Sequence, residues 1–464
     1  MNHIFSGKEV TILIMLFLVS NIFMVNTSAD NAVNNQYQLL ILCPDQLAEG
    51  FQTLKEHKDS HGISTVIVTL SDIYEETYFH LAGRDTAEQI KYFIKNSKEQ
   101  WNITYVMLVG GQEEMPIRYS NFNFIAFPTD DKRLISDLYY ADLYDENGSF
   151  CSWDSNNNTI FGEINDTGEI DSVDLYPDVY VGRVLCSDMN EVDVVVNKII
   201  NYENNIQDSS SLNNILLVGG DTFTALLDEL ILMTAYRSIS TEKCRIGPEG
   251  EYLCEYISKI IDDKNLIKCY ASGSIRKDAK RLTVSNINDA INQGCLFSLI
   301  DGHGSEISFS THYPFNRFLL LPMPLGYTVY NIKQLNNNEK LTITIFNCCL
   351  CGKFDNYSDP IAWTFINHEQ GGSIASLACT TFTWSPAGSY APHSLNGFLT
   401  TDLFRSYSTG TKILGDLWGA SISNYLDSDT AMLSFMPILR WQHYAILEEW
   451  ILFGDPSLKI GGYD

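Results

Sequence analysis

Basic residues are scarce in this sequence. Lysine and arginine number 30 against 57 aspartate and glutamate residues, which gives a formal charge of −27. A chain with so few cations has little to neutralise phosphates, so we expect no nucleic-acid partner. Long apolar runs are also scarce, since none follows residue 25, so we expect no stable transmembrane segment after an N-terminal signal has been removed.

The longest apolar run, Val10–Val25, follows Lys8 and leads into small and polar residues that end at Ala29. This order is typical of a secretory signal peptide, so we predict that residues 1–29 are a signal peptide. The protein would then be secreted, as an extracellular or cell-surface protein. An uncleaved membrane anchor is the alternative, although the run is short for a full span.

The eleven cysteines match no small disulfide framework, and their odd number favours a free thiol. Cys348, Cys349 and Cys351 lie close together in the sequence. Neither a second cysteine pair nor histidines at ligand spacing accompany them, so a structural zinc site is disfavoured.

Apolar, strand-like runs alternate with helical stretches along most of the chain, which predicts an α/β fold with parallel sheets. In the N-terminal half the expected strands are 37–42, 64–70, 105–109 and 178–184, and the expected helices are 86–99 and 190–203. In the C-terminal half the expected strands are 215–218, 266–270, 296–300, 341–346 and 372–377. We predict two subdomains, 30–210 and 211–464, each a parallel-rich sheet flanked by helices, because the polar stretch 205–213 is typical of a linker.

The segment 137–178 is rich in Asp, Asn, Gly and Tyr and predicts a long acidic loop. Within it Asp154, Asn156 and Asn158 place side-chain oxygens at alternate positions, and Ile160 would add a carbonyl oxygen. This resembles the first half of a calcium loop, without its usual glycine and with the last acid too early for an EF-hand. A structural Ca²⁺ site and a solvated asparagine-rich loop are both compatible with the pattern.

Two predicted strands end shortly before residues of the types that can perform nucleophilic catalysis. The strand 296–300 leads to His303 between two glycines, and the strand 341–346 leads to Cys349. The carboxyl ends of parallel strands share one edge of a sheet, where ligands bind. An imidazole there could take the proton of the thiol and later give it to a leaving amine. The backbone N–H groups of Gly304 and Cys349 are candidate oxyanion donors, whereas a turn histidine and a buried structural thiol are the alternatives.

A series of motifs follows along the chain: 105–111 (YVMLVGG), Met115-Pro116, 179–183 (VYVGR), 302–306 (GHGSE) and 450–458 (WILFGDPSL). In its content and order this series resembles the gingipain family of cysteine peptidases, within the caspase, legumain and clostripain group. The resemblance covers nearly the whole mature chain. It implies a caspase-like, gingipain-like catalytic domain, calcium binding, and protein or peptide substrates that form a thioester acyl-enzyme.

The resemblance also implies roles for the residues at these motifs. His303 would be the catalytic histidine and Cys349 the nucleophile, because Gly352 lies three residues after Cys349 as in the family. The neighbouring Cys348 and Cys351 remain rivals by proximity.

Three further residues follow from the resemblance. Asp221 matches an acid near the histidine, and a helix N-cap is its equal alternative. Trp384 resembles the tryptophan of the primary specificity pocket, with ordinary packing as the alternative. The pocket aspartate of arginine-specific members has no clean counterpart here, but Glu249 could serve, so a basic P1 residue is an expectation.

The predicted reaction is peptide-bond hydrolysis through a Cys–His dyad, with no cofactor for catalysis. A transpeptidase or ligase would use the same acyl-enzyme. A non-catalytic secreted module that binds peptide or glycan would instead have Cys349 buried or disulfide-bonded, and a calcium-dependent surface protein is a third alternative.

Overall fold

The computed structural model describes residues 36–123, 132–165, 168–169, 171–204, 211–223, 248–313, 325–355, 359–428 and 440–463. The predicted signal peptide, residues 1–29, lies outside the described residues. The chain divides into two units, Met1–Gln36 and Tyr37–Asp464, and every element named below belongs to the second unit.

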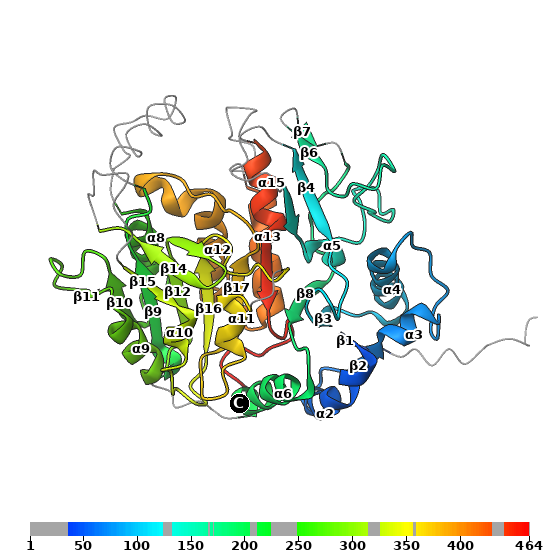
Figure 1. The fold of residues 1–464 in the computed structure, drawn as a ribbon, viewed down its shortest axis with the longest axis horizontal. Helices are drawn as coiled ribbons and strands as arrows, with labels where there is room; N and C mark the ends of the chain where they lie inside the picture. The colour runs from blue at the N-terminus through cyan, green and yellow to red at the C-terminus, as the bar shows by residue number, and fades with distance from the viewer. Residues whose placement is uncertain are drawn as a thin grey trace, which may run out of the picture. The chain divides into compact units, whose positions relative to one another are not determined.

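One sheet of eleven strands, most of them parallel, runs through this unit in the order β11-β10-β9-β12-β16-β17-β18-β8-β3-β1-β2 (Figure 1). Its strands are β1 (Leu39–Cys43), β2 (Thr65–Thr69), β3 (Tyr105–Val109), β8 (Tyr180–Val184), β9 (Asn214–Gly219), β10 (Asn265–Tyr270), β11 (Lys280–Arg281), β12 (Phe297–Asp301), β16 (Thr342–Asn347), β17 (Ser373–Cys379) and β18 (Trp450–Phe453). Each strand predicted from an apolar run is present. β1, β3, β9, β12, β16 and β17 are buried at every residue, which is why they form continuous runs rather than alternating patterns.

The strands of the two predicted subdomains are continuous in this sheet, whereas the sequence predicted two separate sheets. They are joined by β18, which pairs antiparallel with β17 and, through Phe453 and Arg183, parallel with β8. A four-residue apolar run cannot be assigned to a strand by its periodicity, so no sequence pattern indicates this junction. The subdomain boundary near residue 210 stays a prediction.

The helices that flank the sheet are α2 (Gln52–Ser60), α3 (Leu70–Tyr74), α4 (Thr86–Trp101), α6 (Met189–Asn204), α8 (Glu249–Ile260), α9 (Val284–Gln293), α10 (Val329–Ile332), α11 (Ile361–Ile366), α12 (Leu395–Ser408), α13 (Leu414–Leu426) and α15 (Arg440–Glu448). The two predicted helices correspond to α4 and α6. Asp85 caps the start of α4 by accepting a hydrogen bond from the Glu88 N–H, and Asn102 ends it in the left-handed conformation. Among the described helices, none is long and apolar enough to cross a membrane.

Two small sheets stand apart from the large one. β13 (His303–Ser305), β14 (Ser308–Thr311) and β15 (Leu325–Thr328) form a three-stranded sheet that carries His303. β4 (Tyr119–Asn123), β5 (Arg133–Ile135), β6 (Ile164–Asn165) and β7 (Gly168–Glu169) form the other. The predicted loop 137–178 contains only β6, β7 and the short helix α5 (Leu138–Ala141) among its described elements, as its composition indicates.

Buried charges tie the C-terminal segment to the N-terminal half. The Lys58 ammonium on α2 lies 2.8 Å from a carboxylate oxygen of Glu203 on α6 and 2.5 Å from one of Asp455, and the three side chains are buried. The two carboxylates raise the pKa of Lys58, although its burial acts in the opposite direction. Because each charge is desolvated, the cation and the anions depend on one another.

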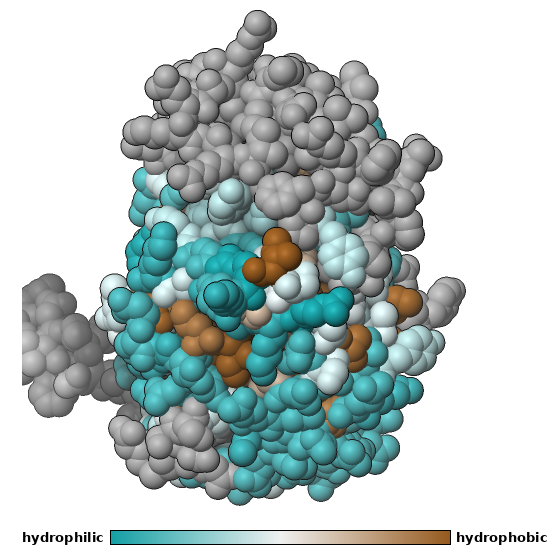
Figure 2. Space-filling model, turned by 90° about the vertical axis from the view of Figure 1, so that its left-hand side faces the viewer, coloured by the Kyte–Doolittle hydropathy of each residue, from teal (hydrophilic) through white to brown (hydrophobic). Residues whose placement is uncertain are grey.

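The face that carries β10, β11 and α9 is mainly hydrophilic, with only small and separate apolar areas (Figure 2). Scattered apolar residues of this kind are usual on a protein surface.

Candidate active site

The register of the central strands brings the predicted dyad to one edge of the sheet. β12 and β16 are parallel neighbours, and their last paired residues are Asp301 and Asn347. His303 and Cys349 each follow two residues later. The Asn347 amide donates a hydrogen bond to the Asp301 carboxylate, so the two strands are held together just before His303 and Cys349.

Gly304 packs directly against the cysteine loop. A Cβ atom at this residue would lie 2.3 Å from the Cys349 carbonyl oxygen, 2.7 Å from Cys351 Sγ and 2.8 Å from Cys348 Cβ. No side chain fits there, so the absence of one at Gly304 lets the histidine strand approach the nucleophile loop. The structure thus brings His303 and Cys349 to adjoining backbone segments, as the sequence predicted.

Cys349 is the most accessible thiol of the described part of the chain. It is half-buried, whereas the other described cysteines are buried, and none of those described forms a disulfide. Its rivals Cys348 and Cys351 are both 0% exposed. Exposure therefore separates the three neighbours, which their proximity in the sequence could not do.

The thiol of Cys349 is protonated in its resting environment. Burial raises its pKa to about 12, and a hydrogen bond from the Thr383 N–H, 3.4 Å from Sγ, acts in the opposite direction. Because the thiolate is the nucleophilic form, such a thiol needs a base beside it. The loop that carries it is fixed to β17 and its continuation, since the N–H groups of Leu350 and Gly352 donate to the carbonyls of Thr381 and Cys379.

His303 is held in one tautomer. Its Nε2 atom lies 2.7 Å from the Thr222 carbonyl oxygen, and because a carbonyl only accepts, Nε2 carries the proton. Nδ1 of the neutral ring is then free to act as a base. Burial lowers the pKa of His303, and the nearby His312 ring, with centroids 5.6 Å apart, lowers it further. The imidazole is therefore neutral near pH 7.

Asp221 lies beside this histidine strand, although the described hydrogen bond of the imidazole goes to Thr222. The Asp221 backbone pairs with His312, and its carbonyl oxygen accepts a hydrogen bond from the Thr311 hydroxyl at 3.0 Å. Asp221 is buried just beyond the end of β9 and thereby fixes β14 next to the site. The Thr222 carbonyl is a site group that sequence reasoning missed, because any residue type supplies such an oxygen.

Glu249 is buried at the start of α8 and holds two loops together. Its carboxylate accepts hydrogen bonds from the N–H groups of Thr222 and Phe223, at 3.2 and 3.3 Å, and from Gly388 at 2.7 Å. It therefore links the segment that holds His303 to the loop that follows Trp384. Glu249 lies in the region where the sequence placed the substrate pocket, with its carboxylate already bound by backbone donors.

Trp384 follows directly after Thr383, the residue that contacts the Cys349 thiol. Its side chain is half-buried and packs edge-on against Trp441, with ring centroids 4.7 Å apart. The indole thus has a packing role, on the residue that follows the backbone contact of the nucleophile.

The proposed calcium residues satisfy one another without an ion. Asp154 accepts hydrogen bonds from the N–H groups of Asn158 and Thr159 and forms an ion pair with Arg84. The side-chain oxygens of Asn156 and Asn158 also accept backbone N–H groups. Because Arg84 and these amides occupy the oxygens, the arrangement does not fit a calcium ion as it stands, and the calcium site stays a prediction.

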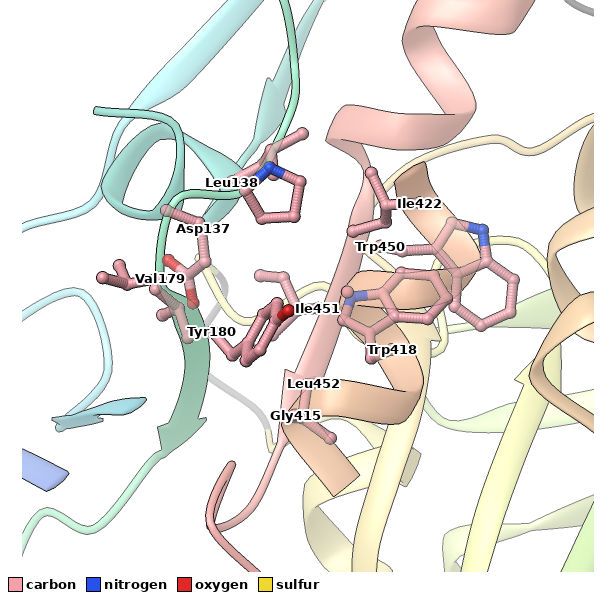
Figure 3. Close-up of a pocket in the computed structure, with 14 residues that line it drawn as sticks. Asp137, Leu138, Val179, Tyr180, Gly415, Trp418, Ile422, Trp450, Ile451 and Leu452 are labelled. Atoms are coloured by element: carbon pink, nitrogen blue, oxygen red, sulfur yellow. The ribbon is translucent and has the colours of Figure 1, made fainter. Parts of the chain in front are cut away.

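A mostly apolar pocket is seen elsewhere in the sheet region (Figure 3). It is bounded by β8, β18 and α13, and Tyr180, Trp418 and Ile422 are among its lining residues. Neither His303 nor Cys349 is among the residues that line it.

Comparison with known proteins decides the family. The family described as "Peptidase family C25" matches residues 32–461. The chain belongs to peptidase family C25. The gingipain-type resemblance of its motifs is thereby confirmed.

Two gingipains are among the curated relatives of this C25 family member. Gingipain R2 of Porphyromonas gingivalis (strain ATCC BAA-308 / W83) is 21% identical over 432 residues, which cover 91% of this chain and 46% of the relative. Gingipain R1 of Porphyromonas gingivalis is 20% identical, over 91% of this chain and 34% of the relative. The chain thus spans about half the length, or less, of the curated relatives it matches.

Solved structures of the same type confirm the fold of this C25 family member. The complex of Porphyromonas gingivalis RgpB pro- and mature domains superposes with a TM-score of 0.62 and 19% identity, over 91% of this chain and 79% of that one. The Arg-specific cysteine proteinase gingipain R (RGPB) gives 0.61 and 18%, over 92% and 78%. The predicted caspase-like, gingipain-like α/β fold is therefore confirmed.

Proposed function

We propose that this C25 family member is a secreted cysteine endopeptidase in which Cys349 is the nucleophile and His303 its base. The observation that carries the proposal is the close packing of Gly304 on the Cys349 loop, which sets the histidine strand against the loop that carries the half-buried thiol. The family supports a cysteine peptidase. Secretion rests on the sequence of residues 1–29 alone.

The first half of the reaction forms an acyl-enzyme. Cys349 Sγ attacks the carbonyl carbon of the substrate while His303 Nδ1 takes the thiol proton. The backbone N–H groups of Gly304 and Cys349 would donate to the oxyanion of the tetrahedral intermediate. The C–N bond then breaks, His303 gives its proton to the leaving amine, and the thioester remains on Cys349.

The second half consumes the thioester. His303 takes a proton from water, the hydroxide oxygen attacks the thioester carbonyl, and the C–S bond breaks with return of the proton to Sγ. The acid product leaves and the resting thiol is restored. A transpeptidase or ligase differs only in that an amine replaces this water.

For substrate choice, we propose a basic P1 residue. Support comes from the structural relative described as an Arg-specific cysteine proteinase, and from the acidic side chain of Glu249, which is bonded to the loop that follows Trp384. Because Glu249 already accepts three backbone N–H groups, direct recognition competes with a purely structural role, and Glu249→Gln separates the two. Loss of selectivity for basic P1 with retained turnover would indicate direct recognition, whereas a uniform loss for all substrates would indicate a structural role in the pocket walls.

The test is hydrolysis of a fluorogenic peptide panel with Arg, Lys, Asn, Asp or Leu at P1 by the secreted full chain. We expect cleavage by the wild-type protein, and loss of turnover by at least about 100-fold, the scale of nucleophile and base removal, in Cys349→Ala and His303→Ala. Cys348→Ala is the matched control, since its thiol adjoins Cys349 but is buried. Cleavage that survives Cys349→Ala would exclude this function, and addition of an amine nucleophile distinguishes transfer from hydrolysis.

The non-catalytic alternative is disfavoured by one observation. A binding module of this fold would have no reason to keep Cys349 free and half-buried on a loop against which the strand of a tautomer-fixed histidine packs.

A further inference from the structure

We propose that Thr383 and Glu449 are positioning residues that set the orientation and the ionisation of the Cys349 thiol. This inference rests on the proposed function, because it gives Cys349 the role of nucleophile. Neither residue belongs to the motifs that identified the site. Their contacts below the cysteine loop carry the assignment.

Thr383 brackets the sulfur of Cys349 with its backbone. Its N–H lies 3.4 Å from Sγ as a donor, and its carbonyl oxygen lies 3.8 Å from Sγ as an acceptor. The N–H stabilises a thiolate, and the carbonyl accepts the proton of a thiol. Both protonation states of Cys349 thus meet a partner on the same residue.

The side chain of Thr383 is itself held by a hydrogen bond from Asn396. Asn396 Nδ2 donates to the Thr383 hydroxyl oxygen, and Asn396 Oδ1 accepts from the indole N–H of Trp450 at 3.0 Å. The Thr383 hydroxyl also carries a proton that it can donate. The carboxyl group beside it is that of Glu449.

Glu449 is a carboxylic acid buried without a cation. It connects α15 to β18, its carbonyl oxygen accepts the Thr380 N–H at 2.8 Å, and its side chain is 0% exposed. Neither carboxyl oxygen has hydrogen-bond geometry with a group in the described part of the chain. A lone buried carboxylate is costly, so the group stays protonated, and burial accordingly raises the pKa of Glu449 well above its usual value.

The groups that face Glu449 are few. Glu449 precedes Trp450, which pairs with Cys379 on β17, and the carbonyl oxygen of Cys379 accepts the Gly352 N–H of the cysteine loop. Glu449 is thus attached to the strand that holds this loop, and Thr383 and Cys379 act on its carboxyl group. Within the described residues no lysine, arginine or histidine contributes to its ionisation. When Glu449 is neutral it leaves the Cys349 thiolate undisturbed, and when it ionises it raises the pKa of Cys349.

Two consequences follow for the nucleophile. A neutral group at Glu449 favours formation of the thiolate, so loss of the Glu449 proton at alkaline pH limits the reactivity of Cys349. A fixed Thr383 keeps Sγ aligned, so loss of its hydroxyl lowers turnover without changing the substrate pocket.

The test is the pH profile of Cys349 alkylation by iodoacetamide in the full chain, with the modified residue located by peptide mass spectrometry. Glu449→Gln replaces the carboxyl by a neutral isostere. We expect its alkylation midpoint to fall by about one pH unit, which is about tenfold more thiolate at pH values that lie above the pKa of Glu449 and below the midpoint. Glu448→Gln is the matched control, because the Glu448 carboxyl is directed toward Gly162 instead. An alkylation profile that is the same in both variants would overturn the role of Glu449.

Thr383→Val provides an independent arm should Glu449→Gln fail to fold. This near-isosteric change removes only the hydroxyl, and we expect kcat to fall about tenfold with KM unchanged, as for loss of alignment in the transition state. An unchanged kcat would overturn the role of Thr383. Peptidase activity in Cys349→Ala would instead overturn the proposed function, so the two failures are distinguishable.

Discussion

Replacing Gly304 by alanine tests how closely the histidine strand and the nucleophile loop are packed. The new methyl carbon would lie 2.3 Å from the Cys349 carbonyl oxygen and 2.7 Å from Cys351 Sγ, both closer than van der Waals contact allows. Because β13 is paired with β14, and the cysteine loop is bonded to β17, neither segment can move without breaking hydrogen bonds. Overpacking of this kind costs about 1–3 kcal/mol of unfolding free energy.

The effect on activity should exceed the effect on stability. A shift of about 1 Å between reacting groups can lower kcat/KM about 100-fold, and the relief of this clash moves His303 away from Cys349. The assay is steady-state hydrolysis of the best peptide from the panel, with thermal unfolding of each variant measured in parallel. The control is Gly111→Ala, whose Cβ would meet only Glu114 Oε2 at an ordinary 3.5 Å. If Gly304→Ala kept wild-type kcat/KM and stability, close packing at this contact would be refuted.

Three further outcomes follow from buried charges and from the predicted ion site. Lys58→Ala leaves two buried carboxylates without their cation and should cost about 3–5 kcal/mol in denaturant unfolding, whereas a loss below about 1 kcal/mol would contradict an interdependent network. Burial raises the pKa of Asp301 from 3.8 to about 7, so the stability that its protonated form contributes is fully present below pH 3.8 and is lost as the pH rises through about 7. Wild type should therefore lose unfolding free energy relative to Asp301→Asn over that window, and parallel pH profiles would contradict this. The predicted Ca²⁺ site in the Asp154 loop is tested by chelation, which should lower the unfolding temperature of wild type but not of Asp154→Ala. An equal change in unfolding temperature in the two proteins would exclude the site.

Much of the sheet could be predicted because its central strands are buried on both faces. Short apolar runs such as Leu39–Cys43 and Thr342–Asn347 are typical of strands buried on both faces, and alternation with helices then implies parallel pairing. The same logic placed His303 and Cys349 at one edge, since both follow parallel neighbours. Gly304, next to His303, gave a second indication of the site, because a glycine is often found where the backbone contacts another segment closely, here the cysteine loop.

The groups that orient the dyad could not be predicted. The partner of His303 is the carbonyl of Thr222, and that of Cys349 is the N–H of Thr383, and every non-proline residue carries both kinds of group. Likewise Glu448 and Glu449 are adjacent residues of one type, and only the structure shows that the Glu448 carboxyl lies near Gly162, whereas ionisation of Glu449 acts on the pKa of Cys349. Long-range contacts of this kind leave no local pattern.

The sequence also could not predict that the strands of the N-terminal and C-terminal halves join in one sheet. It depends on four residues of β18, whose pairing with β17 is antiparallel and so breaks the α/β alternation on which the prediction relied.

The identity of the nucleophile is tested most directly by covalent labelling. The secreted full chain is incubated with a peptidyl acyloxymethyl ketone that has arginine or lysine at P1, and the modified residue is located by mass spectrometry. We predict one label per chain, on Cys349, which is absent in Cys349→Ala and retained in Cys348→Ala and Cys351→Ala, because those two thiols are 0% exposed. A label on either neighbour, or labelling that persists in folded Cys349→Ala, would contradict this assignment.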